Sequence, residues 1–157
     1  MSKIDFAYLA GFFDGEGCIQ ITGDKYVLHC GITNTNKWVL ELFRFNFSGS
    51  VAKKQTYQPN QQPLFRWFCS STTARVFLET LLPYLKIKRA QAEVAIKFQL
   101  RKEKAHYVHS VHPMPESERI LREAERVILR KLKREAEVNI DNLRLASNEK
   151  DNQIRLF

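Results

Sequence analysis

Hydrophobic and polar residues alternate with a period of two early in the chain. The alternation runs through residues 17–22, where Ile19 and Ile21 share a face, and again through residues 25–34. A period of two places successive side chains on opposite faces of a strand. Because Gly23 marks a turn between the two segments, they predict a hairpin with one buried face.

The following segments repeat this plan. Apolar residues at helical spacing predict one helix before the first hairpin, another after it and a third after a second hairpin. The expected helices span residues 5–14, 36–47 and 72–82, and the second hairpin pairs residues 50–57 with residues 64–71. This order predicts an α+β fold in which helices cover one side of an antiparallel sheet.

The rest of the chain reads as helical. A helix is expected over residues 86–104, and another over residues 116–138 after a loop. The second has an apolar stripe at 3.6-residue spacing, formed by Ile120, Leu121, Ala124, Val127, Ile128 and Leu132. The polar tail, residues 139–157, is expected to be frayed or weakly helical.

Length and composition narrow the class of protein. The 157 residues suffice for one domain with a hydrophobic core, and the net charge of +8 favours a polyanionic partner such as nucleic acid. The apolar runs are too short to span a membrane, and residues 1–6 lack the apolar stretch of a signal peptide. Cys18, Cys30 and Cys69 are spaced too widely for a zinc site, so we expect reduced core thiols in a reducing, intracellular compartment.

The first expected helix combines small residues with two acids at its end. Ala7, Ala10 and Gly11 lack bulk, so this helix can closely approach another helix. Asp14 and Glu16 follow where the helix is expected to stop. A helix C-terminus is already partly negative, so carboxylates there are unfavourable without a cation. The position therefore indicates a divalent metal ion bound by oxygen ligands.

Residues 9–17 read Leu-Ala-Gly-Phe-Phe-Asp-Gly-Glu-Gly. This nonapeptide resembles the signature of the LAGLIDADG homing endonucleases, with Gly15 in place of Ala. Glu16 stands where Asp is commonest in that family and lengthens the reach of the carboxylate by one methylene. The element order up to about residue 102 also agrees with the family core. The resemblance implies an αββαββα core whose four-stranded antiparallel saddle sheet binds DNA. We expect residues 1–104 to form this core and residues 105–157 a helical extension of the same domain.

The chain has one copy of the acidic motif. In the family, single-motif proteins work as homodimers, with the two motif helices packed around a twofold axis. The resemblance therefore implies a dimer seam formed by Ala7, Ala10 and Gly11. The alternative is that these small residues pack against another helix of the same chain.

The resemblance also assigns chemistry at the end of the motif. It implies that Glu16 and a backbone carbonyl near Gly15 bind the metal, with Mg²⁺ as the expected ion and Mn²⁺ or Ca²⁺ able to substitute in binding. Asp14 matches a position that more often supports the helix end. Lys88 matches a lysine near the scissile phosphate, where an ammonium group stabilises transition-state charge. A solvated surface lysine is the alternative.

The end of the second strand carries two further candidates. Residues 33–37 resemble the family's exit from that strand, which implies that Asn34 orders water and that Lys37 contacts phosphate near the catalytic centre. A helix-capping role is equally compatible with the Asn and Thr residues of this segment.

The face of the sheet away from the helices is expected to read DNA, because a two-stranded ribbon fits the major groove. By alternation, the first hairpin contributes Gln20, Thr22, Asp24, Lys25 and His29. Candidates from the second hairpin, whose facing is ambiguous, are Lys53, Lys54, Gln55, Arg66 and Trp67. The same residue types are also routine on a solvated sheet. The basic run at residues 130–134 contacts phosphates or forms a solvated helix face.

One other cluster invites a metal hypothesis. His106, His109 and His112 recur every three residues, but Pro113 and Pro115 favour a loop. No cysteine or acid cluster completes a coordination sphere, so the loop interpretation is preferred.

The resemblance thus implies a site-specific homing endonuclease that makes a double-strand break in a long pseudo-palindromic DNA site by metal-dependent hydrolysis. One alternative is a cleavage-inactive DNA-binding regulator or an RNA-splicing maturase on the same fold. Another is a basic interaction domain without nucleic acid, which explains neither the motif nor the element order. An intron- or intein-encoded protein in a chloroplast, a mitochondrion or a microbial cytoplasm is expected.

Overall fold

The computed structural model describes the backbone of residues 3–55, 62–105 and 114–154, and the side chains of residues 5–55, 62–105 and 114–135. Its elements are α1 (Lys3–Glu16), β1 (Gly17–Thr22), β2 (Val27–Asn34), α2 (Lys37–Phe47), β3 (Ser50–Lys54), β4 (Leu64–Ser70), α3 (Ser71–Leu81), α4 (Arg89–Lys104) and α5 (Glu116–Ile154). The predicted α+β fold, an αββαββα core followed by further helices, is confirmed.

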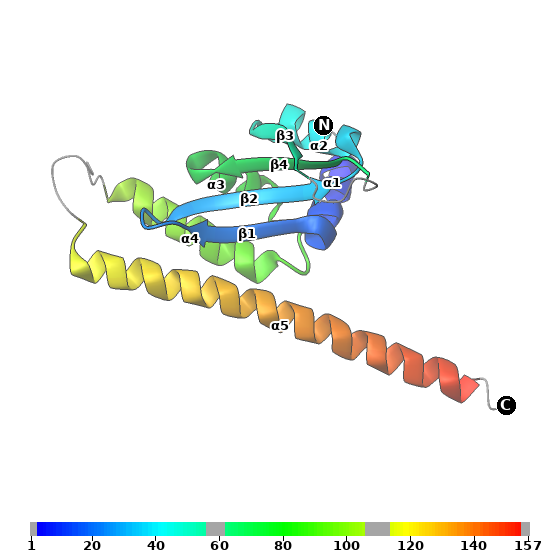
Figure 1. The fold of residues 1–157 in the computed structure, drawn as a ribbon. Helices are drawn as coiled ribbons and strands as arrows, with labels where there is room; N and C mark the ends of the chain where they lie inside the picture. The colour runs from blue at the N-terminus through cyan, green and yellow to red at the C-terminus, as the bar shows by residue number, and fades with distance from the viewer. Residues whose placement is uncertain (1–2, 56–61, 106–113, 155–157) are drawn as a thin grey trace.

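The two hairpins form one sheet in which all neighbours are antiparallel, in the order β1-β2-β4-β3 (Figure 1). Pairing between β2 and β4 joins the hairpins, and β1 and β3 are the edges. The register aligns Gly17 with Ile32, and Ile32 with Trp67. Trp67 in turn lies opposite Val51 on β3. Since the side-chain period of a strand is two, this register fixes which residues share a face.

One face of the sheet, which we call the inner face, packs against the helices. Aromatic side chains dominate this contact. The ring centroid of Trp67 lies 5.2 Å from that of Phe43 on α2 and 4.9 Å from that of Phe77 on α3. Phe13 of α1 meets Phe77 edge-to-face at 4.8 Å. The motif helix is therefore fixed to the same core as the sheet.

Two of the three cysteines lie in this core, as expected. Cys30 and Cys69 are buried opposite one another on β2 and β4, and Cys18 is half-buried on β1. All three thiols are free. Burial, with the neighbouring thiol of Cys69, raises the pKa of Cys30 well above its ordinary value.

Several boundaries differ from the prediction. Lys25 belongs to the β1–β2 turn rather than to β2, because the chain closes a turn in which the Tyr26 amide donates to the Gly23 carbonyl at 3.2 Å. The backbone of α5 stays helical to Ile154, beyond the expected end at Val138. Neither this helix nor any other in the described part of the chain has the length and apolar character needed to cross a membrane. The three histidines of residues 106–112 lie outside the described residues.

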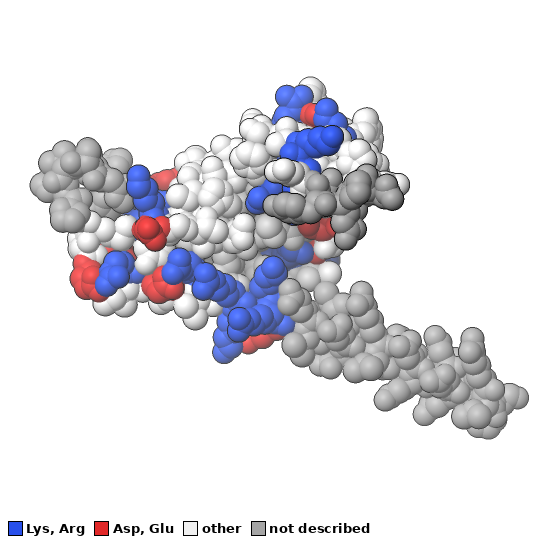
Figure 2. Space-filling view, in the orientation of Figure 1, with Lys and Arg blue, Asp and Glu red and all other residues white. Residues whose placement is uncertain are grey.

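Helix α5 runs beside α4 and β1 and then extends past the rest of the molecule (Figure 1). Its inward side is formed by ion pairs as well as by the buried Leu129. Arg101 of α4 pairs with Glu118 at 2.6 Å and also with Glu125. Arg122 is 1% exposed and donates to Glu118 at 2.6 Å. Lys and Arg side chains also gather along the described part of α5 (Figure 2).

The predicted apolar stripe of α5 does not face the subunit. Ile120, Leu121, Val127 and Ile128 are exposed, with 61% for Ile120 and 51% for Val127, and Leu132 is half-buried. Apolar residues at helical spacing therefore do not mark the packing face of this helix. The physical reason is that α4 presents Arg101 to α5, so carboxylates of α5 turn inward to meet it.

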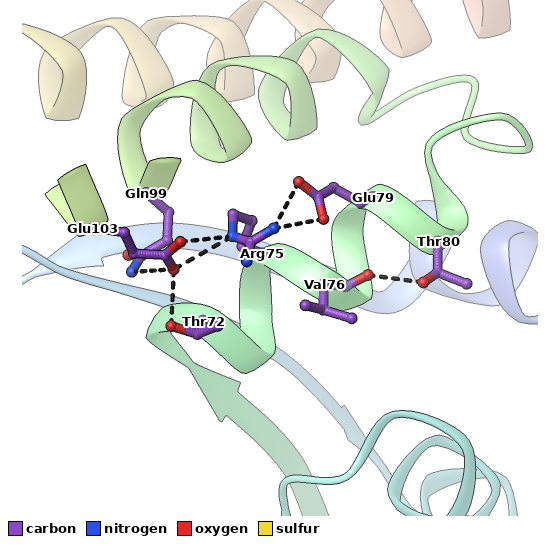
Figure 3. A network of polar contacts seen from close by, with 7 residues as sticks. All are labelled: Thr72, Arg75, Val76, Glu79, Thr80, Gln99 and Glu103. Atoms are coloured by element: carbon purple, nitrogen blue, oxygen red, sulfur yellow. Dashed lines mark hydrogen bonds and ion pairs between the residues drawn. The ribbon is translucent and has the colours of Figure 1, made fainter. Parts of the chain in front are cut away.

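Helices α3 and α4 are held together by a polar clasp (Figure 3). Arg75 of α3 donates to Glu103 of α4 at 3.0 Å and to Glu79 at 2.7 Å. Glu103 also accepts from Thr72 at 2.8 Å and from Gln99 at 3.1 Å. Burial opposes ionisation of Glu103, but these hydrogen bonds outweigh it and lower its pKa. The clasp fixes the two helices whose connecting loop reaches the end of α1.

Candidate functional site

The loop before α4 is bound to the end of the motif helix by Asp14. This carboxylate is 7% exposed and accepts three backbone N–H groups. The donors are the amides of Lys86, Ile87 and Lys88, at 2.7, 3.2 and 2.9 Å. A carboxylate that binds several amides is a strong structural anchor. Asp14 therefore holds the loop, and α4 begins at Arg89 instead of at the predicted residue 86 because these amides bind Asp14.

Lys88 is brought to the end of α1 by the same anchor. Its ammonium group donates to the backbone carbonyl of Asp14, which is 74 residues away in the chain. Burial lowers the pKa of Lys88, and Lys133 of α5 lowers it further. Asp14 and Glu16 act in the opposite direction and favour the charged form. The side chain is therefore a partly desolvated cation beside the acidic motif.

Glu16 has the opposite environment to Asp14. It is the last residue of α1 and is exposed, and its side chain forms no hydrogen bond or ion pair with the described residues. The last carbonyls of a helix have no partner within it, so the carbonyl of Gly15 is also a possible ligand. The carboxylate and the carbonyls thus place negative charge at one exposed point.

The Glu16 carboxylate and the Gly15 carbonyl are too few to bind a divalent cation without further ligands. No cluster of three or more His, Cys, Asp or Glu side chains suited to a metal occurs within the described part of the chain. Mg²⁺ commonly uses one or two carboxylates and completes its shell with water and substrate phosphate. Glu16 and the Gly15 carbonyl match that pattern if nucleic acid or a second copy supplies the remaining ligands.

Asn34 and Lys37 lie at the same end of the sheet as Glu16, since Gly17 pairs with Ile32 on β2. The Asn34 side chain accepts from the Asn36 amide at 2.9 Å and so closes the turn after β2. Lys37 starts α2, with its ammonium 3.6 Å from Glu41 and 5.9 Å from the ring centroid of Phe65. Both have structural contacts here, and their catalytic roles stay predictions.

The other face of the sheet, which we call the outer face, gathers half of the residues predicted to read DNA. The register puts alternate residues of all four strands on this face. Together they line a hollow of ≈500 Å³ formed by Gln20, Thr22, His29, Ala52, Lys53, Lys54, Arg66 and Phe68. Phe68 was not predicted from the sequence, although it follows Arg66 by the two residues that strand alternation requires.

Arg66 lies flat on the outer face. Its guanidinium is 5.9 Å from the ring centroid of Phe68. A Cβ atom at Gly31 on the neighbouring strand would be 3.4 Å from two of the guanidinium nitrogens. The glycine therefore leaves space for the arginine to cross the sheet.

His29 sits in the same cationic surroundings. Partial burial lowers its pKa, and the nearby charges of Arg66 and Lys102 lower it further. The uncharged imidazole is therefore favoured, and in that form one nitrogen donates and the other accepts a hydrogen bond.

Trp67 does not belong to the outer face, and its assignment to DNA was wrong. The side chain is 0% exposed on the inner face, and its indole nitrogen donates to the Ser48 carbonyl at 2.9 Å. Lys53 also alternates onto the inner face, opposite Phe65 at the edge, from where it reaches the rim of the hollow. Asp24 and Lys25 are exposed in the hairpin turn, and Gln55 is exposed just after β3.

The small residues of α1 divide between two environments. Ala7 and Gly11 are exposed, and nothing lies within 4 Å of a Cβ atom built at Gly11 or Gly15. Ala10 is buried inside the subunit, so its assignment to a dimer seam was wrong. Tyr8, next to Ala7, is 54% exposed on the same helix. It was not predicted to be a surface residue, because an aromatic residue at helical spacing indicates a core position.

Comparison with known proteins supports this description. No protein-family model matches the chain. Over 109 residues it is 29% identical to the DNA endonuclease I-CvuI of Chlorella vulgaris, a match that covers 60% of this chain. The chain spans 63% of the length of that relative.

Solved structures agree in fold. A crystal structure of I-CvuI in complex with its DNA target in the presence of 2 mM Ca aligns with a TM-score of 0.53 and 27% identity, covering 83% of this chain and 95% of that one. Another, with a DNA target and 2 mM Mg, has a TM-score of 0.54, 26% identity and coverage of 66% and 70%. The homing endonuclease I-TnaI, at 15% identity, shares the fold with a TM-score of 0.56 over 83% of this chain and 97% of its own. The sequence and the fold thus support a relationship with homing endonucleases.

Proposed function

We propose that this chain is a homing endonuclease that makes a double-strand break in a long, pseudo-palindromic DNA site. One observation carries the proposal: the exposed carboxylate of Glu16, which forms no hydrogen bond or ion pair with the described residues, ends α1 near the partly desolvated ammonium of Lys88. Such a pair of opposite charges suits a centre that binds a metal and a phosphate. The likeness to I-CvuI, a DNA endonuclease, and the cationic outer face support the choice of DNA.

The active form that we propose is a homodimer of the single-motif type. Cleavage of two strands requires two acidic centres, and the chain carries one motif. The exposed line of Ala7, Gly11 and Gly15 has no side chain that would keep a second helix at a distance. Packing of this line against its copy would bring the two Glu16 carboxylates close to one axis. Like charges at that distance repel, and divalent cations would relieve the repulsion.

In this proposal Glu16 and the Gly15 carbonyl hold a divalent ion, with Mg²⁺ as the physiological choice. Structures of I-CvuI with DNA in the presence of Mg or Ca are consistent with that use. A bound divalent ion would polarise the scissile phosphate and lower the pKa of a coordinated water. Asp14 would keep the loop in place, and the Lys88 ammonium would stabilise negative charge on the phosphate. Asn34 would orient water, and Lys37 would contact phosphate.

Sequence reading is proposed for the outer face. Gln20, His29 and Arg66 present donors and acceptors to base edges, whereas Lys54 is suited to phosphate. We further propose that residues 105–157 extend the same domain as the core, and that the protein acts in a reducing compartment of an organelle or a microbe.

Substitution of Glu16→Gln tests the proposal. The variant keeps the size of the side chain and removes its charge, so cleavage is expected to fall by at least about 100-fold, the scale of a lost electrostatic contact in a transition state. Binding of duplex DNA should remain. Cleavage is measured with Mg²⁺ on the I-CvuI target and then on a plasmid library with a randomised insert, whose cut ends are sequenced.

The matched control is Glu116→Gln, which makes the same chemical change at the exposed start of α5. It should cleave as the wild type does, and EDTA should stop both proteins. Binding without cleavage by the wild type would favour the regulator, and unchanged cleavage by Glu16→Gln would remove Glu16 from the mechanism.

A further inference from the structure

A groove separates the edge strand β1 from helix α5. Its volume is ≈250 Å³. The strand side includes Cys18, Gln20 and Thr22, which belong to the outer face of the sheet. The helix side is cationic and is formed by Arg126, Arg130, Leu129 and Lys133. The edge of the predicted DNA-reading surface is therefore walled by positive charge from a part of the chain that lies outside the αββαββα core.

The three cations have a regular spacing. Arg126, Arg130 and Lys133 are separated by four and three residues, which puts them on one face of a helix. With a rise of 1.5 Å per residue they span about 10 Å. One strand of B-DNA carries about three phosphates in that axial length. The spacing therefore matches a short run of the DNA backbone.

The charges in this row are not neutralised equally. Arg126 pairs with Glu123 and lies 5.2 Å from the ring centroid of Tyr26. Arg130 and Lys133 form no ion pair with the described residues, although carboxylates serve most other cations of this helix. Like charges on one helix face repel, and a polyanion lying in the groove would relieve this repulsion.

The row also connects the two surfaces that the proposed function uses. Lys133 is close enough to Lys88 to contribute to its lowered pKa, so one end of the row approaches the candidate cleavage centre. Gln20 and Thr22 line both this groove and the hollow of the outer face. A duplex on the outer face would therefore pass beside the row.

We propose that Arg126, Arg130 and Lys133 form a phosphate-binding ridge that holds one strand of duplex DNA along the β1 edge. The inference rests on the proposed function and extends it to α5. The ridge adds affinity without reading sequence, because phosphates are the same at every base pair. It also fixes the duplex relative to Lys88, so that the scissile phosphate is positioned by a helix outside the core.

The test measures binding rather than cleavage. Fluorescein-labelled duplex DNA of mixed, non-target sequence is titrated with the full chain in EDTA at several KCl concentrations. The variant Arg130→Ala/Lys133→Ala removes the two cations of the ridge that lack a carboxylate partner among the described residues. Each lost phosphate contact reduces the slope of log affinity against log salt by about 0.9, so the slope should fall by about 1.8. Affinity near 0.1 M salt should fall by at least about tenfold.

The control variant, Lys97→Ala/Lys104→Ala, also removes two positive charges. Both lysines are exposed on α4. The control should keep the wild-type slope, and both variants should keep the wild-type melting temperature, because alanine favours a helix.

Equal slopes in the two variants would overturn the ridge and leave the proposed function intact. A wild-type protein that binds no duplex DNA would overturn both.

Discussion

The inner and outer faces of the sheet differ in what their residues do. On the inner face, Trp67 is enclosed by aromatic rings and donates its indole hydrogen to a backbone carbonyl. One residue earlier on the same strand, Arg66 lies across the outer face beside Phe68. Strand alternation therefore separates residues that specify the fold from those available to a ligand. A prediction of function from residue type fails when the face is misassigned, as it did for Trp67.

The end of α1 repeats the same division within two residues. Asp14 turns inward and is satisfied by three amides, whereas Glu16 turns outward and has no partner in the described part of the chain. Both are acids in one motif, yet only the inward one is a structural element of the isolated subunit. The exposed carboxylate of Glu16, and not the acidic pair, is therefore the chemically available group.

Trp67→Ala should produce the largest effect on stability. It removes a fully buried ring and leaves the Ser48 carbonyl without its indole donor. Truncation of a buried Trp costs about 3–5 kcal/mol in free energy of unfolding. Urea denaturation followed by circular dichroism measures the change. A loss below about 1 kcal/mol would contradict the burial of this residue.

Asp14→Ala should have the next largest effect. The substitution removes the acceptor of the amides of Lys86, Ile87 and Lys88, and hydrogen bonds to charged groups contribute about 1.5–3 kcal/mol. The free energy of unfolding should therefore fall by about 2–3 kcal/mol. Glu16→Ala is the matched control in the same denaturation experiment and should change stability by less than about 0.5 kcal/mol. Equal losses of stability for the two substitutions would show that Asp14 anchors the fold no more than Glu16 does.

Arg66→Ala should have the smallest effect on the fold and a selective effect on binding. Its surroundings on the outer face are half-exposed, so stability should change by less than about 0.5 kcal/mol. DNA affinity should fall by about 1–3 kcal/mol if the guanidinium contacts a base. Arg44→Ala, an exposed arginine on α2, is the control in a fluorescence anisotropy titration. If Arg44→Ala weakened DNA binding more than Arg66→Ala did, the assignment of DNA binding to the outer face would be wrong.

Much of the fold follows from local patterns, because each strand and helix of the core carries its own period. The order of the elements and the two hairpins were predicted in this way, whereas the motif helix ends at Glu16, two residues beyond its expected end at Asp14. The strand order β1-β2-β4-β3 was not, because pairing of β2 with β4 depends on the packing of both hairpins on the same helices.

The candidate site was predictable only in part. Lys88 was assigned through its resemblance to a family position. The hydrogen bonds that hold Lys88 beside Asp14 join residues more than 70 positions apart, so no local sequence pattern predicts them. The packing face of α5 does not follow from its apolar stripe, because ion pairs to Arg101 and the buried Leu129 form its inward side. Ala10 was misplaced because a small residue serves a seam and a core equally well.

In the proposed homodimer, two copies meet along the exposed line of α1 and bring two Glu16 carboxylates to one DNA duplex. Light scattering measures this directly on the wild type and on Gly11→Arg, whose new side chain has open space in a single subunit and removes a helix-destabilising glycine. The expected mass is about twice 18.4 kDa for the wild type and 18.4 kDa for a folded, cleavage-deficient Gly11→Arg. A wild-type mass of 18.4 kDa, with and without DNA, would contradict the claim.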